Sequence, residues 1–123
     1  ILLYLNVTLN KPIDIELLDD ALDYFEKLPR KVRKKFFVCF DKTKIGIKGK
    51  WFKSIGDDIY EFKTSDGVKF YRLLAFWDKT GHNETLIINT HGFNKKTNKT
   101  PSKEKSKAIR IRKEYFENKP SKT

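Results

Sequence analysis

The chain has 123 residues, 38% of them apolar and 14% aromatic, which is enough to build the hydrophobic core of one domain. Its formal net charge is +11, and residues 94–123 carry eleven Lys or Arg against three acidic residues, so we expect a polyanionic partner, either nucleic acid or an acidic protein. One cysteine, Cys39, excludes an internal disulfide, and the lack of an apolar run of about 18 residues argues against a membrane-spanning helix.

The single thiol fits a reducing compartment, and no signal peptide is visible, so we expect a cytoplasmic protein without a membrane partner. The charge has a simpler interpretation as well. Lys outnumbers Arg 22 to 5, and a solvated lysine-rich surface would have this composition without any polyanion.

The first half of the sequence has helical periodicity. After Pro12, apolar residues recur at spacings of three and four, with Asp14 as the expected N-cap. Pro29 ends this helix and opens a second, basic one, so residues 14–44 are predicted to form an antiparallel helical hairpin. The preceding residues 1–13 resemble a first strand.

The apolar period then changes from 3.6 to 2, which predicts an antiparallel sheet over residues 50–93. Ser-Asp-Gly at 65–67 indicates a hairpin, because Asp-Gly accepts the positive φ angles of a tight turn. The strand at 68–77 is apolar on both faces, as a central strand would be, and its four aromatic residues are expected in the core. They are Phe70, Tyr71, Phe76 and Trp77.

Residues 94–123 are predicted to form a basic loop and a C-terminal helix with Pro101 at its first position. The apolar residues expected to dock this helix are Ala108, Ile109, Ile111, Tyr115 and Phe116. Residues 1–123 together predict one α+β domain, in which an N-terminal helical hairpin packs on a small antiparallel sheet followed by a basic helix.

The segment HGFNKKTNKTP at 91–101 joins the last predicted strand to the basic helix, where side chains on a sheet edge can converge on one ligand. Lys95 and Lys96 lie near Lys99, and crowding by like charges lowers the pKa of a lysine, so that it can accept a proton. Most lysine clusters, however, only bind phosphates electrostatically.

Arg72 is the sole arginine in the sheet region, and an arginine in mid-strand is costly unless it is paired or binds an anion. It can pair with Glu61 across the predicted hairpin, and this pairing is compatible with a functional role. Glu61 would then orient the guanidinium for a phosphate.

Other chemistries have little support in the sequence. His82 and His91 lack metal-ligand spacing, and no HExxH, CxxC or phosphate-binding glycine motif occurs, so neither a metal nor another cofactor is expected. Cys39 lies in an apolar helical stripe, where core packing is the expected role. The remaining lysines, arginine and histidine can bind RNA. They could also cleave it, because RNA supplies its own 2′-hydroxyl nucleophile and needs only a proton acceptor and cations.

The segments IYEFKT, VKFYRLLAFW and LIINTHGFNKKTNKTP, followed by a Glu-containing helix, resemble the phage-derived HigB-like toxin family within the RelE/ParE superfamily. The resemblance covers about residues 50–116. That family has a Tyr-Glu-Leu-Arg strand, a Tyr-Arg strand and a His-Gly-Phe-x-Lys-Lys-Thr-x-Lys-Thr-Pro segment. Lys63 stands where its first strand has arginine, so a bidentate phosphate fork is lost here.

The resemblance implies a RelE-like fold and the toxin of a type II toxin–antitoxin system, a ribosome-dependent mRNA endonuclease. Its partners would be the ribosome, mRNA and a cognate antitoxin, commonly a helix-turn-helix protein. For inhibition we predict that an acidic or apolar antitoxin segment covers Lys95, Lys96 and Arg72. The residues expected to carry cleavage are Arg72, Lys95, Lys96, His91 and Lys63, with Glu61 as structural support. Those expected to contact RNA are Lys53, Lys99, Lys103, Lys107 and Arg110.

His91 has an alternative interpretation as a strand-end histidine that bonds a neighbouring loop. Two alternative functions also stay open. A ParE-like protein would poison DNA gyrase and need no RNA-cleaving site. A non-catalytic nucleic-acid-binding module is the second, although exposed aromatic stacking platforms are not obvious in the sequence.

Overall fold

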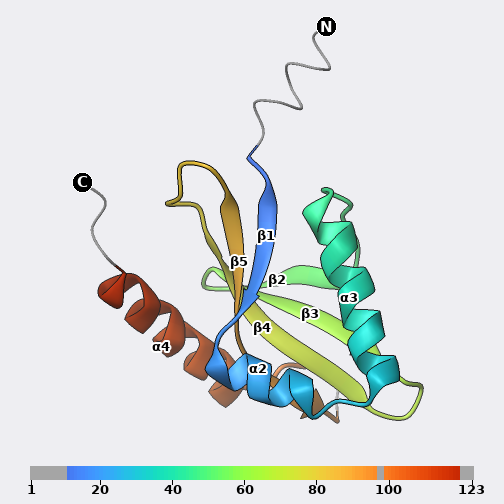
Figure 1. Ribbon diagram of the computed structural model, residues 1–123. Helices are drawn as coiled ribbons and strands as arrows, with labels where there is room; N and C mark the ends of the chain where they lie inside the picture. Colours follow the sequence, from blue (N-terminus) through green and yellow to red (C-terminus); the bar gives the residue numbers. More distant parts are fainter. Residues whose placement is uncertain (1–10, 97–98, 120–123) are drawn as a thin grey trace, which may run out of the picture.

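A computed structural model of the chain describes residues 11–96 and 99–119. Five strands form one mixed sheet in the order β1-β5-β4-β3-β2, and three helices flank it within the described residues, which confirms the α+β class (Figure 1). The elements in chain order are β1 (Ile13–Leu17), α2 (Asp19–Glu26), α3 (Arg30–Lys44), β2 (Phe52–Gly56), β3 (Ile59–Ser65), β4 (Phe70–Asp78), β5 (Thr85–Lys95) and α4 (Ser102–Asn118).

The predicted antiparallel sheet is confirmed for β2 to β5, which pair in sequence order. The Asp-Gly turn between β3 and β4 is also present. Gly67 has a φ of 91°, and Asp66 accepts hydrogen bonds from the backbone N–H groups of Val68 (2.9 Å) and Lys69 (2.7 Å). Alternation along these strands therefore sets which side chains share a face of the sheet.

The start of the predicted helical hairpin is wrong, because residues 13–17 form β1, which pairs in parallel with β5. Asp14 is a strand residue and not a helix N-cap. The apolar residues at 13, 15 and 17 alternate with acidic ones and are half-buried, so the same residues fit the period of a strand. These residues fit a helical period and a strand period equally well, and their pairing with β5, some 70 residues later, makes them a strand. The first strand predicted at 1–13 lies, for residues 1–10, outside the described residues.

Helices α2 and α3 cover one face of the sheet. Phe25 of α2 contacts Phe36 and Phe40 of α3 (ring centroids 6.2 Å apart in both pairs), and Phe40 in turn packs edge-on against Phe62 of β3 at 4.9 Å. The two helices meet at a steep angle and do not run side by side as a hairpin would (Figure 1). Cys39 is buried in this layer, as expected.

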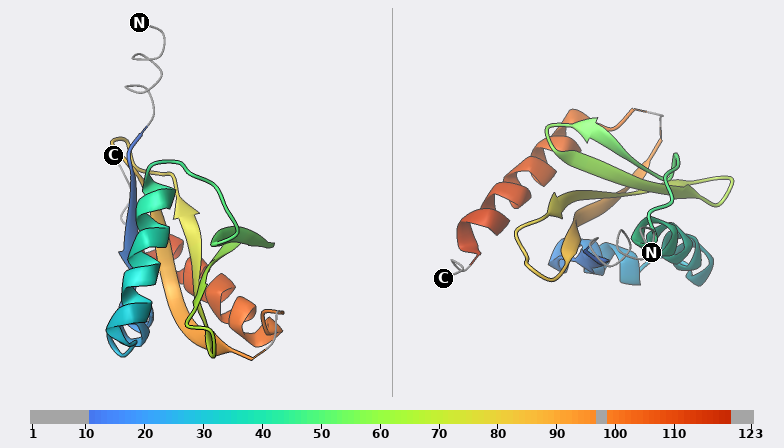
Figure 2. Two further views of the ribbon diagram at one scale, coloured as in Figure 1. Left: turned by 90° about the vertical axis from the view of Figure 1, so that its right-hand side faces the viewer. Right: turned by 90° about the horizontal axis from the view of Figure 1, so that it is seen from above.

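Helix α4 lies on the opposite face of the sheet (Figure 2). Ala108 is fully buried, and Tyr115 and Phe116 pack against Phe76 of β4, whereas Ile109 is exposed, contrary to prediction. The buried carboxylate of Asp78 fixes the far end of α4, since it accepts hydrogen bonds from the Tyr115 hydroxyl (2.5 Å) and from Lys119 Nζ (2.6 Å). At its other end, α4 is held by an ion pair of Lys105 with Asp57 (2.8 Å), and Thr100, just before the helix, donates a hydrogen bond to Glu61 of β3.

Candidate functional site

Glu61, in the middle of β3, faces the α4 side of the sheet and is only 2% exposed. Its Oε1 lies 3.3 Å from Nε of Arg72 on β4 and 3.8 Å from Nζ of Lys95 at the end of β5, while Thr100 donates a hydrogen bond to Oε2. We call Glu61, Arg72, Lys95 and Thr100 the Glu61 cluster. The predicted pairing of Arg72 with Glu61 is confirmed, and the buried carboxylate compensates two buried cations.

Lys95 is the last residue of β5 and pairs with Phe70 of β4, so it is not in the loop where the sequence placed it. Its side chain is 3% exposed, and burial lowers the pKa of its amine, with Arg72 and Lys53 acting in the same direction and Glu61 opposing them. The expected direction of the pKa shift is therefore confirmed. Its main cause is burial and not crowding by the adjacent lysines, and Lys96 is exposed to solvent.

Two further lysines border the Glu61 cluster. Lys53 of β2 pairs with Glu61 of β3, and Lys63, two residues further along β3, pairs with Arg72 of β4, so both lysines lie on the same face of the sheet as Glu61. Partial burial lowers the pKa of Lys63, and the neighbouring charges of Lys53 and Arg72 lower it further. Positive charge is thus concentrated where three strands and the start of α4 meet.

A hollow of about 420 Å³ opens beside the Glu61 cluster, within the usual size of ligand pockets, roughly 300–1,000 Å³. We call it the basic hollow. It is lined by Lys53, Ser54, Ile55, Glu61, Lys95, Lys99, Thr100, Ser102 and Lys105. Four lysines against one carboxylate make it suited to an anion such as a phosphodiester.

Residues 23–113 match the family model of the phage-derived protein Gp49-like family (DUF891). The match spans most of the chain and includes the whole Glu61 cluster. The chain belongs to this family. The Gp49-like family is of the RelE/HigB-like toxin type found in phage-related proteins, so the resemblance seen in the sequence holds at that level. Comparison with curated proteins gives no match.

In this Gp49-like chain, Arg72 supports the site from beside the basic hollow and does not line it. Its Nη1 donates hydrogen bonds to the backbone carbonyls of Tyr71 (3.0 Å) and Thr64 (3.5 Å), while its Nε faces Glu61. Burial lowers the pKa of the guanidinium, and the nearby Glu61 carboxylate raises it. Arg72 therefore adds positive charge near Lys95 and fixes the position of Glu61.

His91 is 3% exposed and does not line the basic hollow. Its Nδ1 lies 2.9 Å from the Thr90 hydroxyl, and its Nε2 lies 3.6 Å from a carboxylate oxygen of Glu104 on α4. Burial lowers the pKa of the imidazole, and the charge of Lys107 lowers it further, against the opposing effect of Glu104. The alternative interpretation of His91 as a structural residue fits this geometry, with α4 as its partner instead of a loop.

The Gp49-like chain places the predicted RNA-contacting residues of α4 in different surroundings. Lys103 is exposed, Lys107 forms an ion pair with Asp20 of α2 (3.3 Å), and Arg110 pairs with Glu114 on the same helix (3.3 Å). Lys105 and Thr100 were not predicted as site residues, yet they line the basic hollow together with Lys99. A helical wheel places Lys105 on a different side of α4 from Lys103 and Lys107. It does not show which side of the helix meets the sheet.

Phe70 is 40% exposed, contrary to the prediction that it lies in the core. Its ring lies on the same face as the Glu61 cluster, opposite Lys95 in the β4–β5 pairing, and the guanidinium carbon of Arg72 lies 6.0 Å from the ring centroid. An exposed aromatic ring next to buried cations can stack on a nucleobase. An aromatic platform is therefore present beside the site.

Across residues 11–96 and 99–119, no three His, Cys, Asp or Glu side chains are grouped so that they could hold a metal ion. None of the described helices is both long enough and apolar enough to cross a membrane.

Proposed function

We propose that this chain is the toxin of a type II toxin–antitoxin system, with a RelE-like fold, and that it cleaves mRNA in the ribosome without a metal ion. The observation that carries the proposal is Lys95, a buried lysine with a lowered pKa, on the wall of a hollow rich in lysine. Membership of a phage-derived family of the toxin type supports the same conclusion.

The chemistry follows from the side chains at the basic hollow. The neutral amine of Lys95 takes the proton of the ribose 2′-hydroxyl, whose oxygen bonds to the adjacent phosphorus while the bond to the 5′-oxygen breaks. The products are a 2′,3′-cyclic phosphate and a 5′-hydroxyl, which receives its proton from the Lys95 ammonium or from water. Lys53, Lys99 and Lys105 stabilise the negative charge that develops on the phosphate oxygens. The charges of Arg72 and Lys53 help to hold the pKa of Lys95 down, and Glu61 keeps the cations in place. Lys63, whose pKa is also lowered, adds positive charge beside Arg72.

The remaining roles concern binding. Lys96, just after the end of β5, and Lys103, on α4, are both exposed. They can contact phosphates of the mRNA or of ribosomal RNA. Phe70 lies where a base next to the cleaved bond could stack. The cellular setting of this activity is the cytoplasm, with a cognate antitoxin as inhibitor.

The test is induced expression in a bacterial host of the wild type, of Lys95→Ala and Arg72→Ala, and of Lys113→Ala as a control at an exposed position of α4. We expect new mRNA 5′ ends within translated regions for the wild type and the control, and their loss in the two site variants. Intact mRNA with altered DNA supercoiling would instead indicate a gyrase poison. Loss of function with charge reversal on α4, but not with Arg72→Ala, would indicate a non-catalytic binding module.

A further inference from the structure

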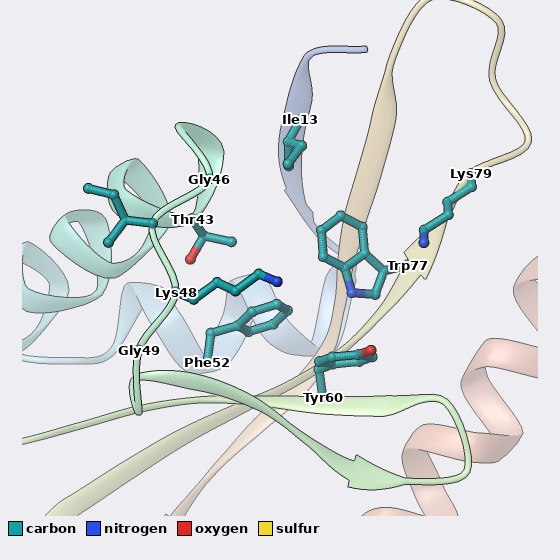
Figure 3. A pocket seen from close by; sticks show the side chains of 10 residues that line it. Ile13, Thr43, Gly46, Lys48, Gly49, Phe52, Tyr60, Trp77 and Lys79 are labelled. Carbon is teal, nitrogen blue, oxygen red and sulfur yellow. The ribbon is translucent and has the colours of Figure 1, made fainter. Parts of the chain in front are cut away.

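A second hollow, of about 390 Å³, lies on the other face of the sheet from the Glu61 cluster, next to the C-terminal end of α3 (Figure 3). Three aromatic rings form its wall. Phe52 and Tyr60 stack with centroids 5.2 Å apart, and Trp77 meets them edge-on at 6.1 and 6.2 Å. We call this site the aromatic hollow. Its rings pack on one another and still leave space for another side chain.

The rim of the aromatic hollow is basic. Lys48 and Lys79 line it, and no Asp or Glu is among the described residues that do so. The amino group of Lys79 lies 5.3 Å from the centroid of the Trp77 ring, and Figure 3 shows the amino group of Lys48 directed toward the space between Phe52 and Trp77. A ligand that enters this space meets two positive charges, so it should carry negative charge.

The loop between α3 and β2 adds exposed apolar surface to the rim. Ile45 is 75% exposed and Ile47 is 48% exposed, and Ile47 lines the hollow together with Ile13 of β1. Branched aliphatic side chains offer no flat face for a nucleobase, but they do pack well against aliphatic or aromatic side chains of a protein. The three aromatic rings could stack a base, but they already pack on one another, and the exposed isoleucines beside them fit an aliphatic side chain. We therefore take an acidic peptide as the occupant, with RNA as the competing outcome of the test.

The Glu61 cluster is a poorer place for such a partner. Arg72 and Lys95 are each 6% exposed and lie within 4 Å of the Glu61 carboxylate, so they offer little free charge at the surface. Tyr60 and Trp77 point to the opposite face from Glu61, because successive residues of a strand alternate. A protein segment in the aromatic hollow would leave the basic hollow open.

We propose that the aromatic hollow is the docking site of an acidic peptide segment, which inserts one apolar side chain between Trp77 and Ile47 and pairs its carboxylates with Lys48 and Lys79. In a toxin this segment belongs to the inhibitory partner. Only the naming of that partner rests on the proposed function, since the binding itself does not require nuclease activity.

The chain carries its own reporters for this site. It has two tryptophans, and both indole N–H groups are close to the aromatic hollow. Trp77 lines the hollow directly, while Trp51 donates a hydrogen bond from Nε1 to the Thr43 hydroxyl at 3.2 Å, and Thr43 is a lining residue. Occupation of the hollow should shift the Trp77 indole resonance, and the Trp51 resonance to a smaller extent.

The test is a titration of the ¹⁵N-labelled full chain, followed through the two indole resonances. The probe is a synthetic peptide of alternating Glu and Ser with one central Leu, and the comparison peptide has Ser in place of that Leu. We expect saturable shifts at Trp77 with the Leu peptide, at least about tenfold weaker binding of the comparison peptide, and a similar weakening by Lys48→Glu. The matched control Lys34→Glu, at an exposed position of α3, should bind like the wild type.

Three outcomes would overturn the proposal. The first is the absence of any Trp77 shift at millimolar Leu peptide. The second is equal binding of the two peptides, which would reduce the site to a charged surface. The third is tighter binding of a uridine hexanucleotide than of the Leu peptide at Trp77, which would make the hollow a nucleic-acid site. Each result is independent of mRNA cleavage, so failure here and failure of the proposed function are distinguishable.

Discussion

Glu61 is the residue on which the arrangement of the site depends. It is buried between Arg72 and Lys95, and removing one partner of a buried ionic group leaves uncompensated charge in the interior, at a cost of about 3–5 kcal/mol. We therefore expect Glu61→Gln, which preserves the shape of the side chain, to lower the free energy of unfolding by about that amount. Urea denaturation followed by circular dichroism measures the change.

The matched control for this prediction is Glu114→Gln. Glu114 pairs with Arg110 on the surface of α4, with both side chains more than half exposed, and pairs of this kind contribute about 0.3–0.5 kcal/mol. Equal destabilisation by the two substitutions would show that Glu61 does not compensate the buried cations.

Phe70 gives a prediction about substrate affinity. Stacking of one base on an aromatic side chain contributes about 1–3 kcal/mol, so Phe70→Ala should raise the KM for RNA by roughly tenfold and change kcat little. Phe70→Tyr, which keeps an aromatic ring, should restore the KM. A fall in kcat without a change in KM would place Phe70 in the chemical step and contradict a stacking role.

Gly92 of β5 determines how closely helix α2 approaches this strand. A Cβ atom at this position would lie 2.0 Å from Cδ2 of the Tyr24 ring, whose hydroxyl donates hydrogen bonds to the Phe93 carbonyl (3.1 Å) and to Asn94 Oδ1 (2.8 Å). Gly92→Ala should therefore displace the helix and destabilise the fold by about 1–3 kcal/mol. The double variant with Tyr24→Ala should lose less than the sum of the two single changes, as a thermal unfolding series would reveal.

His91 connects β5 to α4 and makes the stability dependent on pH. Its folded pKa is below the ordinary value of 6.5, so the folded state favours the neutral imidazole. The contribution of the neutral imidazole to the free energy of unfolding is fully present above pH 6.5. It is lost as the pH falls toward the folded pKa, at up to about 1.4 kcal/mol per pH unit. Glu104, Lys107 and Asp20 are the charged groups around it.

We expect the urea midpoint of the wild type to fall between pH 7.5 and 5.5, and His91→Gln to remove most of this fall. His82 is exposed, so His82→Gln is the control and should behave like the wild type. An unchanged pH dependence in His91→Gln would show that another group causes the loss.

The elements differ in how far the sequence predicts them. Strands β2 to β5 have clear alternation and a turn signal, and the pairing of Glu61 with Arg72 follows from their positions on adjacent strands. Strand β1 was missed because its five residues fit a helical period as well, and only its pairing with β5 decides the matter. Local patterns contain no information on such a distant partner.

The lining of the basic hollow was predicted only in part, for a similar reason. Lys105 enters it because α4 is held to the sheet at both ends, by the ion pair of Lys105 with Asp57 (2.8 Å) and by the bonds of Tyr115 to Asp78. His91 is covered by the same helix, although a strand-end histidine is expected to be accessible. Both results depend on where α4 docks, which its amphipathic pattern does not specify.

In the molecule as a whole, the two faces of the sheet carry different surface features. The α4 face carries the Glu61 cluster and the basic hollow, and the α2–α3 face carries the larger hydrophobic core and the aromatic hollow. Figure 2 shows the helices on opposite sides of the sheet. A partner bound at one face can therefore be separated experimentally from a substrate bound at the other.

In the mechanism that we propose, Lys95 activates the ribose 2′-hydroxyl of mRNA in the ribosome. The most direct measurement uses purified chain, translating ribosomes and two mRNAs that differ only by a 2′-deoxy substitution at the cleaved nucleotide. We predict cleavage of the unmodified mRNA to a 2′,3′-cyclic phosphate, no cleavage of the substituted mRNA, and a loss of about 10²–10⁴-fold in rate for Lys95→Ala, the usual contribution of a general base. Equal cleavage of the two mRNAs, or full activity of Lys95→Ala, would contradict the mechanism.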